Sequence, residues 1–349
     1  MKRLSQAKTI IDSVLGITHS PKMWTWADVF CFILGLLLGT SAFANPVGGQ
    51  VAGGQITITT PDANSMQINQ STNRGIINWQ TYNIAGHEHV NYLQPNSSSI
   101  TLNRINGANG PSSIFGSITA NGRVWLVNPA GIWFAPGSHV DVAGLLATTA
   151  NIRDEDFMAG HYLFNQEAGW NGAIVNEGTI IIREAGLAAF IGVGVVNKGD
   201  IIANLGTVVI GSSKSFVVDF SGDQLINFAV DSANDKYAVD AQGKQLTSAV
   251  SNVGTIVANG GRVVLSAQTA GDVLDHAINM SGSIEAKSVG LVNGEIILSA
   301  NQGTVEVSGK LIASGKNAGE TGGTVIVTGN KVALSDNTLI DVSGDIGGG

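Results

Sequence analysis

The chain has 349 residues, of which 13% are charged and 46 are glycine, and its formal net charge is −8. This acidic balance lacks the excess of Lys and Arg with which nucleic-acid-binding proteins neutralise phosphates. The single cysteine excludes a disulfide scaffold and a cysteine-based zinc site, and a hydrophobic content of 44% is unlike that of a disordered chain. We therefore expect a folded, Gly-rich protein that does not bind nucleic acid.

The first 44 residues have the three parts of a secretory signal peptide. Four basic residues precede an apolar run over 29–38, and the small residues Ala42-Phe43-Ala44 follow it. The run is too short for a membrane-spanning helix, which needs about 20 apolar residues. We predict cleavage after Ala44, with Ala42 and Ala44 as the small residues of the cleavage site. The mature chain then contains no cysteine and has 14 basic against 24 acidic residues.

Short segments with alternating apolar and polar residues recur along the rest of the chain and predict an all-β fold. Examples lie at 55–59, 99–102 and 123–127. Asn, Gly, Ser and Asp interrupt such segments every 8–12 residues. This spacing is typical of a β-sandwich, a β-barrel or a β-solenoid.

A repeated unit favours the β-solenoid, and a tandem of β-sandwiches remains the alternative. The unit places a glycine between a polar residue and a short apolar strand, as in Asn176-Glu-Gly-Thr-Ile180. Its central glycines are Gly178, Gly199, Gly254, Gly282, Gly309 and Gly344. The gaps of 21, 28 and 27 residues match one turn of a parallel β-helix, and we interpret the gap of 55 as two turns with an insertion. Each glycine is expected at a corner that needs positive φ or close approach between turns.

The repeat length predicts roughly a dozen turns and a rod about 55 Å long at the spacing of paired strands. Asn residues suit the corners of such a rod, because they tolerate left-handed geometry and can form ladders. Residues 213–248 break the rhythm and predict a hairpin that projects from the rod. The sequence stops within a repeat without a visible cap, so we expect a chain that continues further or was cut short.

Residues 45–165 contain sequence blocks in a fixed order, at 73–79, 82–84, 94–98, 102–104, 114–122, 124–132 and 140–147, and looser matches follow at Asn151-Ile152, Asp156-Phe157 and Asp219-Phe220. Together these blocks resemble the N-terminal secretion domain of the filamentous haemagglutinin family, the large exoproteins of two-partner secretion (TPS). The residues that carry the first blocks are Asn73, Asn78, Trp79, Asn83, Pro95, Asn96, Asn103, Arg104, Asn121 and Gly122. The family signature Asn-Pro-Asn-Gly-Ile stands here as Asn128-Pro129-Ala130-Gly131-Ile132, with alanine at its third position.

The resemblance implies a right-handed parallel β-helix, or β-solenoid, with N-terminal capping strands and an extra-helical hairpin insertion. It divides the chain into a signal peptide (1–44), a secretion domain (45–300, with the insertion at about 213–248) and the start of further repeats (301–349). It also implies a Gram-negative host and an outer-membrane TPS transporter with periplasmic POTRA-type domains. Export then runs through the periplasm to the cell surface or the medium, and the first turns nucleate folding.

The segment Asn128–Ile132 has two compatible interpretations. Asn-Pro favours a turn after a strand, and Gly131 lets the backbone reverse, so the segment can close the first coil. Alternatively, it is an epitope that the transporter reads before the turn forms.

The resemblance does not determine what the exoprotein does once it is outside the cell. An adhesin or haemagglutinin that binds a host-cell or carbohydrate receptor is the predicted function, and a carrier of a contact-dependent growth-inhibition toxin or a haem-acquisition protein could share this N-terminal sequence. The aromatic rings of Trp79, Trp125, Trp133 and Trp170 would suit stacking on sugars or packing in a core.

We expect no catalytic site, cofactor or metal ion. His87-Glu88-His89 has no third ligand at a suitable spacing, and no Walker loop is present. The acidic run 154–156 is expected to form an exposed loop. A β-helix polysaccharide hydrolase or lyase is the enzyme alternative, with carboxylates in or near the insertion. These carboxylates belong to Asp219, Asp223, Asp231 and Asp235.

Overall fold

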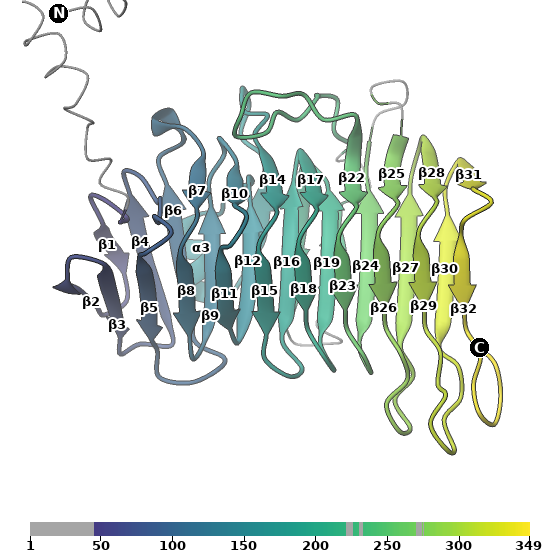
Figure 1. Cartoon of the computed structure of the whole chain (residues 1–349). Coiled ribbons are helices and arrows are strands. Elements are labelled where there is room, and N and C mark those ends of the chain that lie inside the picture. The colour runs from purple at the N-terminus through teal and green to yellow at the C-terminus, as the bar shows by residue number, and fades with distance from the viewer. Residues whose placement is uncertain (1–44, 221–225, 230–232, 270–273, 275) are drawn as a thin grey trace, which may run out of the picture. The chain divides into compact units, whose positions relative to one another are not determined.

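A computed structural model describes residues 45–349 except 221–225, 230–232, 270–273 and 275. These residues wind into the predicted parallel β-helix, in which each full turn contributes one strand to each of three sheets (Figure 1). The predicted signal peptide, including Ala42 and Ala44, lies outside the described residues. In the described part of the chain, no helix has the length and apolar character that crossing a membrane requires.

The strands of each sheet follow the order of the chain. Sheet 1 contains β1 (Gln50–Gly53), β4 (Arg74–Trp79), β6 (Ile100–Ile105), β9 (Arg123–Val127), β12 (Gly144–Thr148), β16 (Leu187–Gly192), β19 (Thr207–Ser212), β24 (Arg262–Ala267), β27 (Glu295–Ala300) and β30 (Thr324–Thr328). Sheet 2 contains β7 (Ser112–Ile114), β10 (Ile132–Phe134), β14 (Ala173–Asn176), β17 (Gly194–Asn197), β22 (Ser248–Asn252), β25 (His276–Met280), β28 (Thr304–Val307) and β31 (Lys331–Leu334). Sheet 3 contains β2 (Ile56–Asp62), β3 (Ser65–Gln70), β5 (His89–Leu93), β8 (Ser117–Ala120), β11 (His139–Val142), β15 (Thr179–Ile182), β18 (Asp200–Ile202), β23 (Thr255–Val257), β26 (Ser283–Glu285), β29 (Lys310–Ile312) and β32 (Leu339–Asp341).

Antiparallel strands cap the N-terminal end of the described β-helix. β1 pairs antiparallel with β4, and β2 pairs antiparallel with β3, whereas every later neighbour in the three sheets pairs in parallel. Nine of the ten strands of sheet 1 are therefore parallel, which gives fewer turns than the dozen that the repeat length predicts. The difference arises because the cap and two long excursions outside the sheets use residues that the estimate assigned to turns.

Inward side chains form continuous apolar columns, as the repeat predicts. In sheet 3 one column joins the last residue of each repeated unit, and in sheet 1 another joins equivalent positions of β12 to β27. The first consists of Ile180, Ile201, Ile256, Ile284 and Leu311, and the second of Ala147, Phe190, Ile210, Leu265 and Leu298. All are at most 1% exposed, so each turn completes the burial of the turn before it.

The glycines of the repeat stack on one another at a corner between sheets 2 and 3. A Cβ added to Gly254 would meet the carbonyl oxygen of Gly199 at 2.1 Å, and one added to Gly282 would meet that of Gly254 at 2.2 Å. The same carbonyls accept hydrogen bonds from the next turn, for example from Thr255 to Gly199 at 3.0 Å. Close approach between turns, and not positive φ, is therefore what requires glycine here.

The stacking also corrects two expectations. Gly254 lies directly on Gly199, so the gap of 55 residues is a single turn with a long excursion, and the interpretation as two turns is wrong. Gly344 does not continue the stack, because its neighbours are Gly347 and Gly322.

A ladder of buried asparagines runs beside the glycine stack. Asn176 donates to Asn197 at 2.8 Å, and Asn197 donates to Asn252 at 2.7 Å, although all three are at most 2% exposed. Asn252 then contacts the sulfur of Met280 at 3.3 Å, where the column becomes apolar. The predicted Asn ladder is confirmed, but in the described residues the only non-glycine residues with positive φ are Ala185 and Leu205. Asn therefore stabilises this corner by side-chain pairing.

Two excursions between sheet 1 and sheet 2 cover the outside of the β-helix. The first contains helix α3 (Asp154–Ala159) and strand β13 (Leu163–Asn165), and the second contains β20 (Ser215–Val218) and β21 (Ile226–Phe228). Strands β13, β20 and β21 form a small antiparallel sheet, which includes the predicted hairpin. The hairpin packs on the outer face of sheet 1 instead of projecting from it, because Phe216 joins a buried cluster with Trp125 and Leu146. The acidic run 154–156 is the first turn of α3 and not a loop.

Substitution of Gly254 by alanine tests the stacked corner. We expect Gly254→Ala to lower the free energy of unfolding by about 3 kcal/mol, because backbone of the preceding turn must move to admit the methyl group. Gly86→Ala is the control, since nothing lies within 4 Å of its added Cβ, and it should change stability by less than about 0.5 kcal/mol. Denaturant unfolding of both variants measures the difference; equal values would contradict the role of close approach.

Candidate functional site in the first coils

The signature segment Asn128–Ile132 forms a tight turn between β9 and β10. The Asn128 side chain is fully buried, and its Nδ2 donates to the Ser112 hydroxyl at 3.0 Å and to the Gly110 carbonyl at 3.2 Å. Its Oδ1 accepts from the amide of Ala130 at 3.0 Å, and its carbonyl accepts from the amide of Gly131 at 3.0 Å. One side chain thus closes the turn and ties it to the preceding coil.

The neighbours of Asn128 fix the same turn. Gly131 has φ of +111°, and a Cβ there would meet the Ala173 carbonyl oxygen at 2.6 Å. Pro129 is buried and Ile132 is 1% exposed, whereas Ala130, which departs from the family signature, is half-buried. The folded turn therefore exposes little of its sequence to a partner.

A second predicted residue, Asn103, is a polar residue inside the core. It occupies an inward position of β6 between Ile77 and Leu126 of the adjacent strands and is fully buried. Its Oδ1 accepts from Trp79 Nε1 at 3.0 Å and from the Tyr92 hydroxyl at 2.9 Å. The amide thus satisfies the polar atoms of large rings from two other strands, so it specifies how the first coils pack.

Burial changes the acidity of the two tyrosines in this network. The Tyr82 and Tyr92 hydroxyls lie 2.7 Å apart, and both rings are at most 1% exposed. Loss of hydration raises the pKa of Tyr82 above its usual range, and the same effect, together with the repulsion that an ionised Tyr82 would exert, raises the pKa of Tyr92 well above it. Both phenols stay protonated in the folded protein at neutral pH.

The remaining block residues use side-chain amides as links between coils. Asn121 exchanges two hydrogen bonds of 2.7 Å with the backbone of Gln94, and Asn83 accepts from the amide of Ser113 at 2.8 Å. Gly122 makes room for Gln94, whose Oε1 would be 2.5 Å from an added Cβ. In contrast, Asn73, Pro95 and Asn96 are exposed.

Gln70 and Gln94 complete a buried chain of hydrogen bonds. Gln94 begins the family block 94–98 but was not predicted as a site residue, and Gln70 belongs to none of the blocks. Thr101 donates to Gln70 Oε1 at 2.7 Å, and Gln94 Nε2 donates to Thr101 Oγ1 at 3.0 Å. Gln70 directly follows Asn69 and Gln94 directly follows Leu93, and Asn69 and Leu93 pair with each other in neighbouring strands. The 24-residue separation of the two glutamines was the available signal, since it equals one turn.

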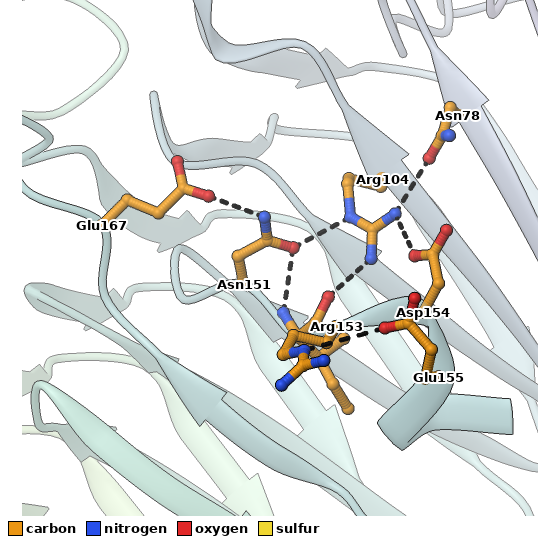
Figure 2. Close-up of polar contacts among 8 residues, drawn as sticks. Asn78, Arg104, Asn151, Arg153, Asp154, Glu155 and Glu167 are labelled. Atoms are coloured by element: carbon orange, nitrogen blue, oxygen red, sulfur yellow. Dashed lines mark hydrogen bonds and ion pairs between the residues drawn. The ribbon is translucent and has the colours of Figure 1, made fainter. Parts of the chain in front are cut away.

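Arg104 connects the first coils to the outer cover, by which we mean the two excursions that contain α3 and β13 and, further along the chain, β20 and β21 (Figure 2). Its guanidinium donates to Asn78 Oδ1 at 3.1 Å, Asn151 Oδ1 at 2.9 Å and the Ile152 carbonyl at 2.6 Å, and it pairs with Asp154 at 2.6 Å. Asn151 in turn donates to Glu167 at 2.7 Å. Asn78 and Arg104, both predicted, therefore meet at one centre. Asn151, which lies in the looser part of the family match, and Asp154 complete this centre, although neither was predicted to contact Arg104.

Other candidate residues do not gather into a site. Trp79 and Trp125 are at most 3% exposed, so neither ring can stack on a sugar. Trp125 faces outward on β9, but Tyr162, Phe157 and Phe220 cover it. Of the acidic candidates, Asp223 and Asp231 lie outside the described residues, and Asp235 pairs with Lys214 at 3.0 Å. Among the residues that the structure describes, no cluster of three metal-ligating side chains is found.

The family follows from a comparison with known proteins. The model of the TPS secretion domain matches residues 42–313 of this chain. The chain belongs to this family. The crystal structure of the HMW1 secretion domain from Haemophilus influenzae is similar, with a TM-score of 0.72 and 30% identity, over 86% of this chain and 74% of that chain. Membership of this family implies a secreted exoprotein that is exported across the outer membrane by two-partner secretion.

Two curated relatives are heme/hemopexin-binding proteins of Haemophilus influenzae. One is 30% identical over 73% of this chain and 27% of its own length, and the other is 28% identical over 82% of this chain and 31% of its own length. The chain therefore spans about 30% of these relatives, and the similarity concerns a TPS secretion domain.

The buried tyrosines predict a loss of stability in alkali. The unfolded chain releases phenolic protons near pH 10, whereas the folded chain retains them. Stabilisation by the neutral phenols is complete below pH 10, and above it the free energy of unfolding should fall by about 1.4 kcal/mol per pH unit for each tyrosine. Denaturant unfolding between pH 8 and 11.5 measures the slope. Tyr82→Phe should reduce it, while Tyr237→Phe, which removes a ring that is 45% exposed, should not.

The Arg104 centre predicts local undocking of the outer cover. We expect Arg104→Gln to lower the free energy of unfolding by about 2 kcal/mol, because a half-buried guanidinium loses several charge-assisted hydrogen bonds. Amide hydrogen exchange should accelerate in α3 and β13 before it does in the core sheets. Arg153→Gln is the control, since its side chain is 77% exposed and its ion pairs are 3.7 and 3.8 Å long. Unchanged exchange in Arg104→Gln would show that α3 docks without this centre.

Proposed function

We propose that residues 45–300 form the signal with which an exoprotein engages its outer-membrane TPS transporter, and that they then nucleate folding of the β-helix outside the cell. The carrying observation is the complete burial of Asn128 in the signature turn. A transporter has no access to this side chain once the turn has formed. We therefore infer that periplasmic POTRA-type domains of the transporter bind the segment while it is extended.

The partners of Asn128 support an early folding step. Ser112 and Gly110 lie 16 and 18 residues before it, so the turn closes on chain that has already left the transporter. Each later turn then pairs with a completed one and buries its apolar column. Burial on the outer side of the membrane biases movement outward without nucleotide hydrolysis.

The route and the boundaries of the signal are part of the same proposal. The signal peptide 1–44 directs the chain to the periplasm and is removed after Ala44, and residues 301–349 add further turns beyond the recognised segment. The exoprotein itself is an adhesin of the cell surface or medium in this proposal. Its receptor is a host-cell surface or a carbohydrate.

The curated relatives suggest a second candidate function for the exoprotein. Their names refer to binding of heme and hemopexin, and one of them is 30% identical to this chain. Heme acquisition by the exoprotein is therefore the alternative to adhesion. Binding of the secreted protein to immobilised hemopexin separates the two: retention favours acquisition, and adherence to host cells without retention favours the adhesin.

A secretion assay tests the recognition proposal. Deleting the partner transporter should abolish appearance of the protein in the medium and on washed cells, and Asn128→Ala should remove most of the secretion. Asn330→Ala is the matched control, because Asn330 is exposed, and it should be secreted like the wild type. Equal secretion without the transporter would overturn the proposal.

A competition experiment separates recognition from a folding defect. A synthetic peptide of residues 119–134 should compete with the unfolded chain for the periplasmic domains of the transporter, whereas the folded protein should not. The same peptide with Asn128→Ala should lose this competition. If only the folded protein competes, the exposed residues Asn73, Pro95 and Asn96 would be the ones recognised, and recognition of an extended segment would be wrong.

A further inference from the structure

A cavity of about 360 Å³ lies where the outer cover meets the first coils. Its floor is the outer face of sheet 1, with Arg74 on β4, Ile100 on β6 and Arg123 on β9. These three residues occupy one row across the sheet, because Arg74 pairs with Ile100 and Ile100 pairs with Arg123. Two guanidinium groups therefore flank one isoleucine, while Tyr162 and Phe220 of the cover complete the walls.

Arg123 is held in place without a counter-charge. Its guanidinium carbon lies 4.0 Å from the centre of the Phe220 ring, in a cation–π contact. Gly144 on the adjacent strand leaves room for its stem, since an added Cβ would be 3.1 Å from Arg123 Cγ. Among the described residues, no carboxylate lies within 4.0 Å of this guanidinium and no hydrogen bond from it is formed.

Arg74 is fixed by neutral partners. Its Nε donates to the Tyr162 hydroxyl at 2.9 Å and its Nη1 donates to the Met158 carbonyl at 3.0 Å. Gly160 allows the guanidinium to approach the end of α3, because an added Cβ would be 2.8 Å from Nη2. Neither of these partners neutralises the charge, and no carboxylate of the described chain lies within ion-pair distance of it.

The cavity therefore carries a positive excess. Asp219 also lines it and has an interaction of its own, so two guanidinium groups face one carboxylate. Burial lowers the pKa of Arg123, the direction expected for a cation with incomplete hydration and no nearby anion. Arg remains protonated at any physiological pH, so the charge persists and an anion that enters the cavity would compensate it.

We propose that this cavity binds a single carboxylate or phosphate group, which Arg123 and Arg74 hold from two sides against Tyr162. The planar guanidinium of Arg123 is preorganised by Phe220 to offer paired N–H donors, the geometry that suits a two-oxygen acceptor. The volume of the cavity admits the anionic group and a small part of the molecule that carries it. The walls come from β4, β6, β9 and the cover, so the site exists only after the cover has docked.

Titration of the full secreted protein, labelled with ¹⁵N, tests the site. Sodium phosphate and sodium acetate are added separately at constant ionic strength, and the Nε–Hε signals of the arginines are followed by NMR. We expect saturable shifts for Arg123 and Arg74, and none for Arg183, which is exposed and pairs with Asp141 at 3.6 Å. Tighter binding of phosphate or of acetate identifies which chemistry the site prefers.

Variants complete the test. Arg123→Gln should weaken binding about tenfold or more, the loss expected when a charged group with paired donors is removed. Arg183→Gln is the matched control and should bind like the wild type. Linear shifts shared by Arg123 and Arg183, or unaltered affinity in Arg123→Gln, would overturn the proposal. If Arg123→Gln does not fold, the wild-type titration decides alone, because a non-saturating response of Arg123 excludes the site.

Discussion

The spacing of paired backbones, about 4.8 Å from one turn to the next, is the constraint on which the rest of this structure depends. Along the sheets that spacing suits any side chain that points inward or outward, but at the corner between sheets 2 and 3 a side chain would point into the backbone of the preceding turn. There the carbonyl of Gly199 lies 2.1 Å from the place where a Cβ of Gly254 would be, so only glycine fits. Asn176, Asn197 and Asn252 stabilise the same corner through their side-chain amides. The repeated glycines and asparagines of this corner are thus consequences of stacking.

The first coils meet a different demand. They have no preceding turn to cover them, so antiparallel strands β1 and β2 close their edges. Their core is also more polar than that of the later coils, with Asn103 and the linked pair of tyrosines inside it. A satisfied polar network tolerates few alternative packings, because any slip leaves buried donors unpaired. This end of the β-helix is thus specified by hydrogen bonds inside its core, and the later coils by apolar columns with the asparagine ladder beside them.

The sequence contained enough information for the fold because the repeat expresses that stacking directly. Glycine at a fixed offset from an apolar strand predicts one turn, and the predicted strand 123–127 is β9 itself. The outer cover was harder to predict from the sequence. Nothing in the spacing indicates that β20 packs on sheet 1, because that depends on Phe216 and Trp125 meeting across 91 residues of chain. A six-residue helix such as α3 likewise offers too few turns for a periodic signal.

The candidate site shows the same division. Blocks resembling the family located Asn103, Arg104 and Asn128, whose burial and bonds explain why those residue types are needed. The contacts that Asn151 and Asp154 of the cover make with Arg104 follow no local pattern and appear only in three dimensions. The order of the chain gives this arrangement a direction. The side chain of Asn103 forms its hydrogen bonds with Trp79, Tyr92 and Trp125, which all lie within 24 residues of it. Arg104, in contrast, bonds to residues of the cover that lie 47 to 50 positions later in the chain. A chain that emerges from its N-terminal end can therefore close its polar core first and dock its cover second.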